Sequence, residues 1–429
     1  MENNNNLKRA IPLKQDTPMW HFQSYQSGCC LRATEVKPKL DKFLIKLVDF
    51  QDNYYLDKSK NNALDYKLWF EPIGCPKEIP IEKPSTDKFG NLKFKKGKQM
   101  YDNLYPLFFA NMGATDRDKK HLIYYPEGVT MHLFSFNTEL LNFIENNLPA
   151  FFASHSFGTR QDKGFGFFSL KDKPLDFLHA KYLFKLPKDV KKLDFETLFQ
   201  YIHYFHKMIR SGINENGVYY KSFMYFYAKE KCNTTWDKPV IRYNFELFSP
   251  LYKHISCQEK NETNDKIKKC PQRAGLKDER ELFAKEKKYK NSKILFRDAL
   301  GLASKQMWLS YGDTIDIVSK EVDRFKSPIT YRPVYENDCW RVYLYFDQGA
   351  IDSIKGRGFE IKNSRNRKIE GMQIFKDFSL EEYFDFIIQI GLARHTDSKE
   401  HGNKKLNYIE NIFNNNNLKK LSNNGNTTK

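Results

Sequence analysis

Apolar residues recur at helical spacing near the start of the chain. They fall at positions i, i+3, i+4 and i+7, which form one face of a helix. These residues are Leu40, Phe43, Leu44 and Leu47. We expect Thr34 as the N-cap, which places Pro38 near the end of the first turn, where a missing N–H costs little.

Strand-like runs surround this helix. Residues 17–23 form one run, and residues 121–127 and 129–136 form two more, expected to pair as a hairpin around Glu127-Gly128. A second helix is predicted over 138–152, followed by a last strand. The order strand, helix, two strands, helix, strand is the βαββαβ order of the ferredoxin-like motif.

The rest of the chain continues as a mixture of helices and strands. An amphipathic helix is predicted over 194–212 and ends at Gly212. The last third is predicted to contain a helix, two strands and a helix, over residues 294–303, 329–334, 340–346 and 380–392. Ser379 and Glu382 make a capping box for the last helix. The pattern therefore predicts an α+β protein.

Composition divides the chain into segments. The stretch 251–293 is polar and highly charged, which is typical of an exposed connector. Both ends are rich in Asn and are expected to be mobile. The predicted organisation is a disordered start, an N-terminal domain with a helical extension, the connector, a C-terminal domain and a disordered tail, over residues 1–10, 11–250, 251–293, 294–412 and 413–429.

Charge adds an argument about partners. The 429 residues contain 71 Lys+Arg against 53 Asp+Glu, a formal net charge of +18, and 15% of them are aromatic. Excess positive charge destabilises a compact chain unless a polyanion offsets it, and aromatic rings beside cations suit single-stranded RNA or DNA. The same composition also arises from an AT-rich genome in proteins that bind nothing, so charge alone leaves both interpretations open.

Apolar runs and cysteines bear on location. No apolar run approaches the ~18 residues that a membrane span needs, and the N-terminus lacks the apolar core of a signal peptide. Seven cysteines without tight spacing argue against a disulfide scaffold and fit a reducing compartment. We therefore expect a soluble, cytoplasmic protein with no membrane partner and no cofactor.

The most informative segment is 157–166. It contains three glycines, with Arg160 and Lys163 between them, at a predicted helix-to-strand junction. Glycines let the backbone approach a ligand closely, so N–H groups and the two cations can together hold phosphates. A tight turn with solvated charges is the alternative. The spacing fits neither a Walker loop nor a dinucleotide fingerprint, so mononucleotide binding is not expected.

Three segments of the chain resemble motifs of known proteins, and they occur in the order found in those proteins. Residues 158–166, before the last strand of the βαββαβ unit, resemble the glycine-rich loop of the RAMP superfamily of CRISPR-associated proteins. Residues 31–43 look like the start of the first helix in that superfamily. Residues 324–330 are similar to an Arg-x-x-Ser-Pro-Leu element in the first subunit of Cmr (type III-B) complexes, and residues 299–302 resemble a run upstream of it.

The resemblance implies two tandem ferredoxin-like, RRM-related domains with helical insertions, which grip guide RNA by its backbone and shape. It implies CRISPR RNA, target RNA and other Cmr-type subunits as partners in an antiviral ribonucleoprotein. It also implies no catalysis in this chain, because a repeated backbone subunit cuts the target in such complexes. The RNA contacts carried over are Arg32, Lys37, Lys39, Lys42, Gly158, Arg160, Lys163, Gly164, Phe165 and Gly166.

Further basic segments are candidate RNA surfaces. Residues 355–368 interleave Gly and Phe with cations, and residues 92–98 and 285–293 are lysine-rich. Residues 355–368 are the best second nucleic-acid surface in the chain, and an ordinary solvated loop is the alternative for each of the three segments. From the first of these segments and from the Ser-Pro element, the candidate contacts are Arg324, Lys326, Arg357, Arg365 and Arg367.

Histidines offer an alternative, catalytic interpretation. His21 and His155 lie near the predicted RNA surface and can be proton-transfer groups that support attack of a 2′-hydroxyl on its phosphate. A structural or RNA-contacting role for each competes with this. A zinc site in the connector lacks a clear fourth ligand, so no metal is assigned; its residues would be His254, Cys257, Cys270 and Cys232.

The sequence thus predicts a non-catalytic RNA-binding subunit of a type III CRISPR ribonucleoprotein. A metal-independent endonuclease that processes CRISPR RNA is the first alternative. A basic structural protein without an RNA ligand is the second.

Overall fold

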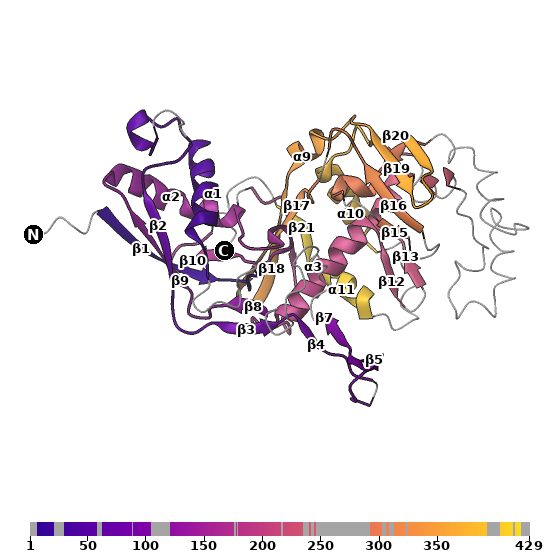
Figure 1. Ribbon diagram of the computed structural model, residues 1–429, viewed down its shortest axis with the longest axis horizontal. Helices are drawn as coiled ribbons and strands as arrows, with labels where there is room; N and C mark the ends of the chain where they lie inside the picture. Colours follow the sequence, from indigo (N-terminus) through magenta and orange to yellow (C-terminus); the bar gives the residue numbers. More distant parts are fainter. Residues whose placement is uncertain are drawn as a thin grey trace, which may run out of the picture. The chain divides into compact units, whose positions relative to one another are not determined.

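The computed structural model (Figure 1) describes residues 7–20, 30–57, 62–87, 89–103, 121–175, 177, 179–215, 218–234, 240–241, 244–245, 292–302, 306–308, 313–322, 325–392, 404–414 and 417–421. Helices and several sheets alternate through these residues, which confirms the predicted α+β class. Most of the predicted connector lies outside the described residues. So do the candidates His21 and Arg324 and the connector residues His254, Cys257 and Cys270.

The chain forms two compact units, each assembled from separate stretches of sequence. The first unit comprises residues 1–202, 330–345 and 421–429, and the second comprises residues 203–329 and 346–420. Residues 330–345 therefore fold with the N-terminal part of the chain, although more than a hundred positions separate them from it.

A four-stranded antiparallel sheet organises the first unit. Its strands are β1 (Lys8–Gln15), β2 (Lys67–Pro72), β9 (Val129–Phe134) and β10 (Phe168–Leu170), in the order β10-β1-β9-β2. Helix α1 (Ala33–Ile45) connects β1 to β2, and α2 (Thr138–Ser154) connects β9 to β10. This is the strand–helix–strand–strand–helix–strand connectivity that the sequence pattern predicts.

The core of this unit lies on one face of the sheet. Side chains alternate between the two faces of a strand, so Leu13, Met131 and Leu133 share a face and are at most 1% exposed. Helices α1 and α2 cover that face (Figure 1), and Leu40 and Leu141 from them are fully buried against it. The amphipathic pattern of both helices thus supplies the second layer.

The first strand lies earlier than predicted. The sequence pattern placed it at 17–23, but β1 ends at Gln15, and of that run Met19 forms an isolated bridge with Ile123. β1 also begins at Lys8, inside the stretch expected to lack structure. The alternation in β1 is easy to miss because Lys and Pro occupy its outward positions.

The predicted hairpin around Glu127-Gly128 is wrong in its pairing. Strand β8 (His121–Tyr124) pairs with β3 (Lys77–Pro80), whereas β9 pairs with β1 and β2. The strand that pairs with β9 in place of β8 is β2, which a long insertion separates from β9. Trp69 obscures the alternation of β2, because this large apolar residue faces outward and is 43% exposed.

The insertion between β2 and β9 forms a narrow two-stranded arm. Strand β4 (Glu82–Pro84) pairs with β7 (Tyr101–Asn103), and β5 (Phe94–Lys95) pairs with β6 (Lys98–Gln99). The basic cluster predicted at 92–98 therefore lies at the end of this arm.

The first helices differ from prediction mainly at their ends. The N-cap of α1 is Arg32 rather than Thr34, and Pro38 lies inside the helix. Leu47 lies beyond the end of α1 and is 51% exposed. Helix α2 is confirmed, and the Asn137 side chain caps it by accepting a hydrogen bond from the Leu140 N–H at 3.0 Å.

Three further strands of the first unit pair in a second sheet. Strand β11 (Tyr182–Lys185) pairs with β18 (Cys339–Phe346), which neighbours β17 (Ile329–Glu336). Asn337 and Asp338 join β17 to β18 with φ of 51° and 56°, as a tight hairpin turn requires. The predicted strands at 329–334 and 340–346 are confirmed, as is the helix over 194–212, which is α3 (Phe195–Arg210).

The second unit contains a five-stranded sheet with the order β14-β20-β19-β16-β15. Helix α10 (Leu380–Ile390) is confirmed, with Ser379 accepting a hydrogen bond from the Glu382 N–H. The helix predicted at 294–303 is wrong, because this short apolar run forms strand β14 and a single 3-10 turn, Arg297–Leu300. The strands are β14 (Ile294–Leu295), β15 (Gln306–Trp308), β16 (Asp313–Val318), β19 (Phe359–Asn363) and β20 (Lys368–Ile374).

Further short elements of the second unit lie outside this sheet. They are β12 (Ile213–Glu215), β13 (Val218–Tyr220), α4 (Phe223–Phe226), a π-helical turn (Tyr227–Lys231), α9 (Gln348–Asp352), α11 (Lys404–Phe413) and β21 (Leu418–Lys420). The strand order differs from that of the first unit, so the structure does not confirm a tandem pair of ferredoxin-like domains. Among the described residues no helix combines the length and apolar character of a bilayer-crossing segment.

Candidate nucleic-acid interface

The glycine-rich segment forms a closed loop between α2 and β10. The Phe157 N–H donates to the Gly166 carbonyl at 2.9 Å, which joins the two ends of the loop. Gly166 has φ of 62°, and a Cβ there would lie 1.9 Å from the Phe157 carbonyl oxygen, so only glycine fits this closure. Arg160 also has a left-handed backbone, with φ of 55°. The loop therefore has one defined conformation rather than that of a loose turn.

The segment that follows β1 holds the loop from one side. The Gly166 N–H donates to the Pro18 carbonyl at 3.0 Å, and the Thr159 N–H donates to the Trp20 carbonyl at 2.7 Å. The Thr17 hydroxyl donates to the Gly164 carbonyl at 2.7 Å and accepts from the Phe167 N–H at 3.0 Å. Residues 17–20 thus support the loop.

Helix α1 holds the loop from a second side through a carboxylate. Glu35 Oε1 accepts hydrogen bonds from the Gly158 N–H at 3.0 Å, from Gln161 Nε2 at 3.1 Å and from Lys39 Nζ at 3.0 Å. Lys39 Nζ also donates to the Ser156 carbonyl at 3.2 Å. The backbone of the loop therefore already binds one anionic group, which is the protein's own Glu35.

A buried arginine supports the loop from strand β17. Arg332 is 4% exposed, and its guanidinium donates to the Gln161 carbonyl at 3.1 Å and to the Ser154 carbonyl at 2.7 Å. Burial lowers the pKa of Arg332 to about 10, so the group stays charged at pH 7. It adds fixed positive potential directly under the loop.

The two cations of the loop lie at its half-buried rim. Burial lowers the pKa of Arg160, and the charge of Asp162 opposes that shift. Lys163 Nζ lies 3.3 Å from an Asp162 carboxylate oxygen and 5.5 Å from the centre of the Tyr331 ring. With Lys39 and Arg332, four cations surround the loop, and Glu35 and Asp162 offset two of them. The region keeps a net positive charge.

Some predicted contacts lie elsewhere. Lys37 Nζ donates to Asp41 at 2.8 Å and to the Leu64 carbonyl at 2.9 Å, on a different side of α1 from Lys39. Phe165 is 2% exposed, and its ring stacks on Phe199 with centroids 3.6 Å apart, so packing occupies both the ring and its surroundings. We therefore remove the Lys37 and Phe165 side chains from the candidate site.

Arg32 and Lys42 are the other two residues of the first helix that were predicted to contact RNA. Arg32 is half-buried at the N-cap of α1, and Lys42 is exposed further along the helix. Gly164, like Gly166, is buried within the loop and contributes backbone only. The site that the structure assembles therefore centres on Lys39, Gly158, Arg160 and Lys163.

Sequence reasoning missed three members of this site. Glu35, Gln161 and Arg332 connect the loop to α1 and β17. The spacing of Glu35 and Lys39, one helical turn apart, is the one signal in the sequence that pointed to such a pair. Arg332 lies in an apolar strand far along the chain, and nothing in the sequence places it at the loop.

His155 has the environment of a structural residue. Its Nδ1 lies 2.9 Å from the Phe151 carbonyl oxygen, and its ring stacks on Phe151 with centroids 4.5 Å apart. Burial lowers the pKa of His155 to about 4, so the imidazole is neutral at pH 7. A neutral ring with Nδ1 hydrogen-bonded to backbone is a poor general acid.

The candidate contacts of the second unit do not form one surface. Arg357 lies before β19, and Arg365 and Arg367 lie in the turn after it, so the length of a five-residue strand separates them. Arg357 forms an ion pair with Glu321 at 3.1 Å, and Arg367 donates to the Phe245 carbonyl at 2.9 Å. Lys326 is exposed on the segment before β17. Segment 355–368 is therefore two separate basic positions.

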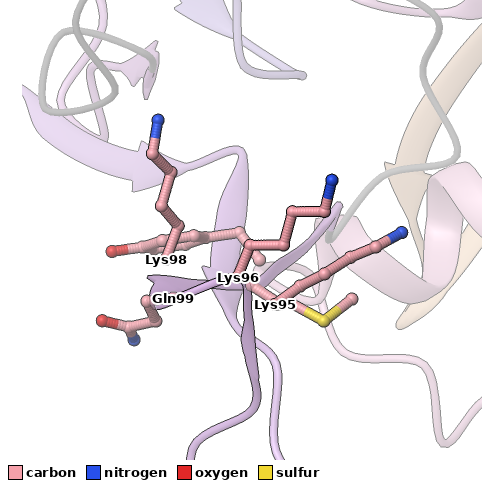
Figure 2. Close-up of a pocket in the computed structure, with 6 residues that line it drawn as sticks. Lys95, Lys96, Lys98 and Gln99 are labelled. Carbon is pink, nitrogen blue, oxygen red and sulfur yellow. The ribbon is translucent and has the colours of Figure 1, made fainter.

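The basic cluster at 92–98 forms the tip of the arm. Figure 2 shows the lysine side chains extending away from the β5–β6 hairpin beside a shallow hollow of about 460 Å³. Lys95, Lys96 and Lys98 line this hollow together with Met100 and Tyr101. The aliphatic stems of the lysines form its walls, and no buried polar group is aimed into it among the residues that line it.

Metal-ligating side chains do not cluster in the described part of the chain. Three or more His, Cys, Asp or Glu residues in a metal-binding arrangement are absent there. Cys232 lies at the end of the π-helical turn, where burial raises the pKa of its thiol to about 11. The other residues of the possible zinc site lie outside the described residues.

Comparison with known families gives two matches that together span nearly the whole chain. Residues 6–213 match the model of the Cmr1 N-terminal domain, and residues 219–420 match the model of the Cmr1 C-terminal domain. No curated protein matches the chain. The boundary between the two matches falls just after α3, near the point where the two compact units divide.

Proposed function

The chain belongs to the Cmr1 family and is thus a Cmr-type subunit of a type III CRISPR effector, and on that premise we propose that it binds RNA without catalysis. It holds guide RNA, target RNA or both, alongside other Cmr-type subunits, in antiviral defence. One observation carries the proposal. The glycine loop has a fixed conformation, and four cations and two carboxylates lie around it.

The loop is suited to phosphate rather than to bases. The Gly158 N–H and Lys39 Nζ converge on one carboxylate oxygen of Glu35, at 3.0 Å each. A phosphate oxygen is an acceptor of the same kind, and it can take this position when Glu35 turns away. Backbone N–H groups and cations that hold phosphates carry no sequence information, so binding is sequence-tolerant and falls steeply with salt.

The state of His155 supports a non-catalytic role. General acid–base catalysis at neutral pH needs a group with a pKa near 7, and the pKa of His155 is about 4. The endonuclease alternative therefore has to rely on other groups. A cyclic-phosphate product from labelled CRISPR RNA in EDTA, lost on changing a histidine, would overturn the non-catalytic proposal.

We extend the proposal to the architecture as well. The first unit has the strand order of a ferredoxin-like domain. We propose that the second unit is a divergent ferredoxin-like domain in which additional strands changed the strand order. The resemblance of residues 324–330 to an element of the first subunit of Cmr complexes supports this proposal.

The test is the salt dependence of RNA binding by the full-length chain. The double variant Arg160→Ala/Lys163→Ala removes two cations from the loop rim. If each contacts one phosphate, the slope of log K against log salt falls by about 1.4, at about 0.7 per contact for a single strand. Binding of unrelated RNA sequences should weaken equally.

The matched control is Lys188→Ala/Lys191→Ala, which removes the same charge from exposed positions of the same unit. We expect its slope to stay near that of the wild type. Equal slopes for both double variants would show that net charge alone drives binding. A wild-type chain that retains no RNA at ~50 mM salt would favour the basic structural protein instead.

A further inference from the structure

The first unit has a second surface that the glycine loop does not use. It is the face of the sheet β10-β1-β9-β2 opposite to the core that α1 and α2 cover. Strand register places its residues in rows across the three strands β1, β9 and β2. The outermost row is Lys8–Phe134–Lys67 and the next is Ala10–His132–Trp69.

This face is open to solvent at its centre. Trp69 is 43% exposed, and Ala10 beside His132 is exposed as well. Phe136, just past the end of β9, is 81% exposed. The inward neighbours Met131 and Leu133 on the same strand are fully buried, so the two faces of β9 differ sharply. Large aromatic side chains on an open sheet face mark an interaction site.

The rings on this face contact one another in two pairs, one stacked and one edge to face. Trp69 and His132 stack with centroids 5.0 Å apart and planes 8° apart. Glu71 fixes the His132 ring, because its carboxylate lies 3.1 Å from His132 Nε2. Phe134 and Phe136 meet edge to face at 5.1 Å. The face therefore presents preorganised flat rings rather than flexible aliphatic side chains.

The charges on this face select the kind of partner. Lys8 and Lys67 flank Phe134 on the two neighbouring strands, and both are exposed. Within the described residues neither lysine forms an ion pair. An aromatic ring between two such ammonium groups matches a nucleotide, whose base stacks while the adjoining phosphates approach the cations. A protein partner would have to desolvate both lysines.

We propose that this sheet face binds single-stranded RNA, with bases stacked on Phe134 and Trp69 and phosphates held by Lys8 and Lys67. The proposal rests on the proposed RNA-binding function and adds a site to it. Phe134 and His132 are two residues apart on β9, which spaces the two rows by about 6.8 Å. Stacking distinguishes unpaired bases from duplex, so this site adds a preference that the phosphate-binding loop lacks.

The test measures binding of the full-length chain to a fluorescent single-stranded 20-mer and to the same sequence as a duplex. Trp69→Ala/Phe134→Ala should lower affinity for the single strand about tenfold or more and leave duplex binding unchanged. Trp69→Phe keeps a ring and should retain most of the affinity. Lys8→Ala/Lys67→Ala should instead lower the salt slope by about 1.4.

The controls separate this proposal from the proposed function. Lys8, Lys67 and Trp69 are exposed and Phe134 is half-buried, so thermal unfolding followed by circular dichroism should stay near that of the wild type. Unchanged single-strand affinity in both double variants would overturn the sheet-face proposal, and the loop would still stand if Arg160→Ala/Lys163→Ala weakened binding. Retained RNA affinity with lost co-purification of other subunits would make the face a protein interface and overturn the proposal too.

Discussion

The glycine loop and the β5–β6 hairpin are both short, basic and glycine-containing in sequence, yet they differ in how the rest of the fold holds them. The loop is fixed by hydrogen bonds from α1, from the segment after β1 and from Arg332. The hairpin projects Lys95, Lys96 and Lys98 beside an open hollow (Figure 2). Positioned cations recognise a ligand at low entropic cost, whereas solvated ones contribute charge only.

The largest expected difference concerns glycine. A Cβ at Gly166 would lie 1.9 Å from the Phe157 carbonyl oxygen, whereas nothing lies within 4 Å of a Cβ at Gly97. Gly166→Ala should lower the free energy of unfolding by at least about 3 kcal/mol, and Gly97→Ala by about 1 kcal/mol, from its left-handed backbone alone. Urea denaturation of both variants measures this. Equal losses would contradict the distinction between the two regions.

The next difference concerns cations. Arg332→Met removes a guanidinium that satisfies two carbonyl groups, so we expect a loss of about 2 to 3 kcal/mol. Lys96→Met, at the exposed hairpin, should change stability by no more than about 0.5 kcal/mol. Both are followed by the urea midpoint at pH 7. A neutral effect of Arg332→Met would mean that the loop does not depend on β17.

A third effect concerns pH. The pKa of His155 is lowered to about 4 in the folded chain, so between that value and about 6.5 the unfolded chain binds the extra proton. The contribution of neutral His155 to the free energy of unfolding is therefore fully present above pH 6.5. It falls as the pH decreases toward 4, by at most about 1.4 kcal/mol per pH unit. His155→Gln should flatten that part of the profile. If His155→Gln leaves the dependence of stability on pH unchanged, another group takes up the proton on unfolding.

The smallest effect concerns the arm. Lys95→Ala/Lys96→Ala should weaken RNA binding no more than the control Lys188→Ala/Lys191→Ala, because solvated lysines act only through net charge. Anisotropy titrations at two salt concentrations compare them. A loss as large as that of Arg160→Ala/Lys163→Ala would place the arm in the RNA interface.

The sequence predicted best where one periodic pattern runs long enough. Helices α2, α3 and α10 and strands β17 and β18 follow from such patterns. Pairing could not be predicted, because the β8–β3 and β9–β2 ladders depend on an insertion that separates partners by tens of residues. Short apolar runs such as 294–303 carry too little periodicity to distinguish helix from strand.

The candidate site shows the same division between local and long-range information. The glycines and the two rim cations of the loop are local, and they could be named from the sequence. Glu35 and Arg332 reach the loop from α1 and β17, and only folding brings them there. Phe165 was assigned to RNA through the resemblance of its segment to the glycine-rich loop of the RAMP superfamily, but α3 covers that ring through Phe199.

Hydrogen–deuterium exchange of the full-length chain, with and without guide RNA, shows which of the two basic regions contacts RNA. If the glycine loop binds RNA, the peptide covering 157–166 exchanges more slowly when RNA is bound, and the hairpin peptide covering 94–99 is unchanged. Bound RNA that leaves exchange in the loop unaltered, or that protects the hairpin instead, would contradict RNA binding by the loop.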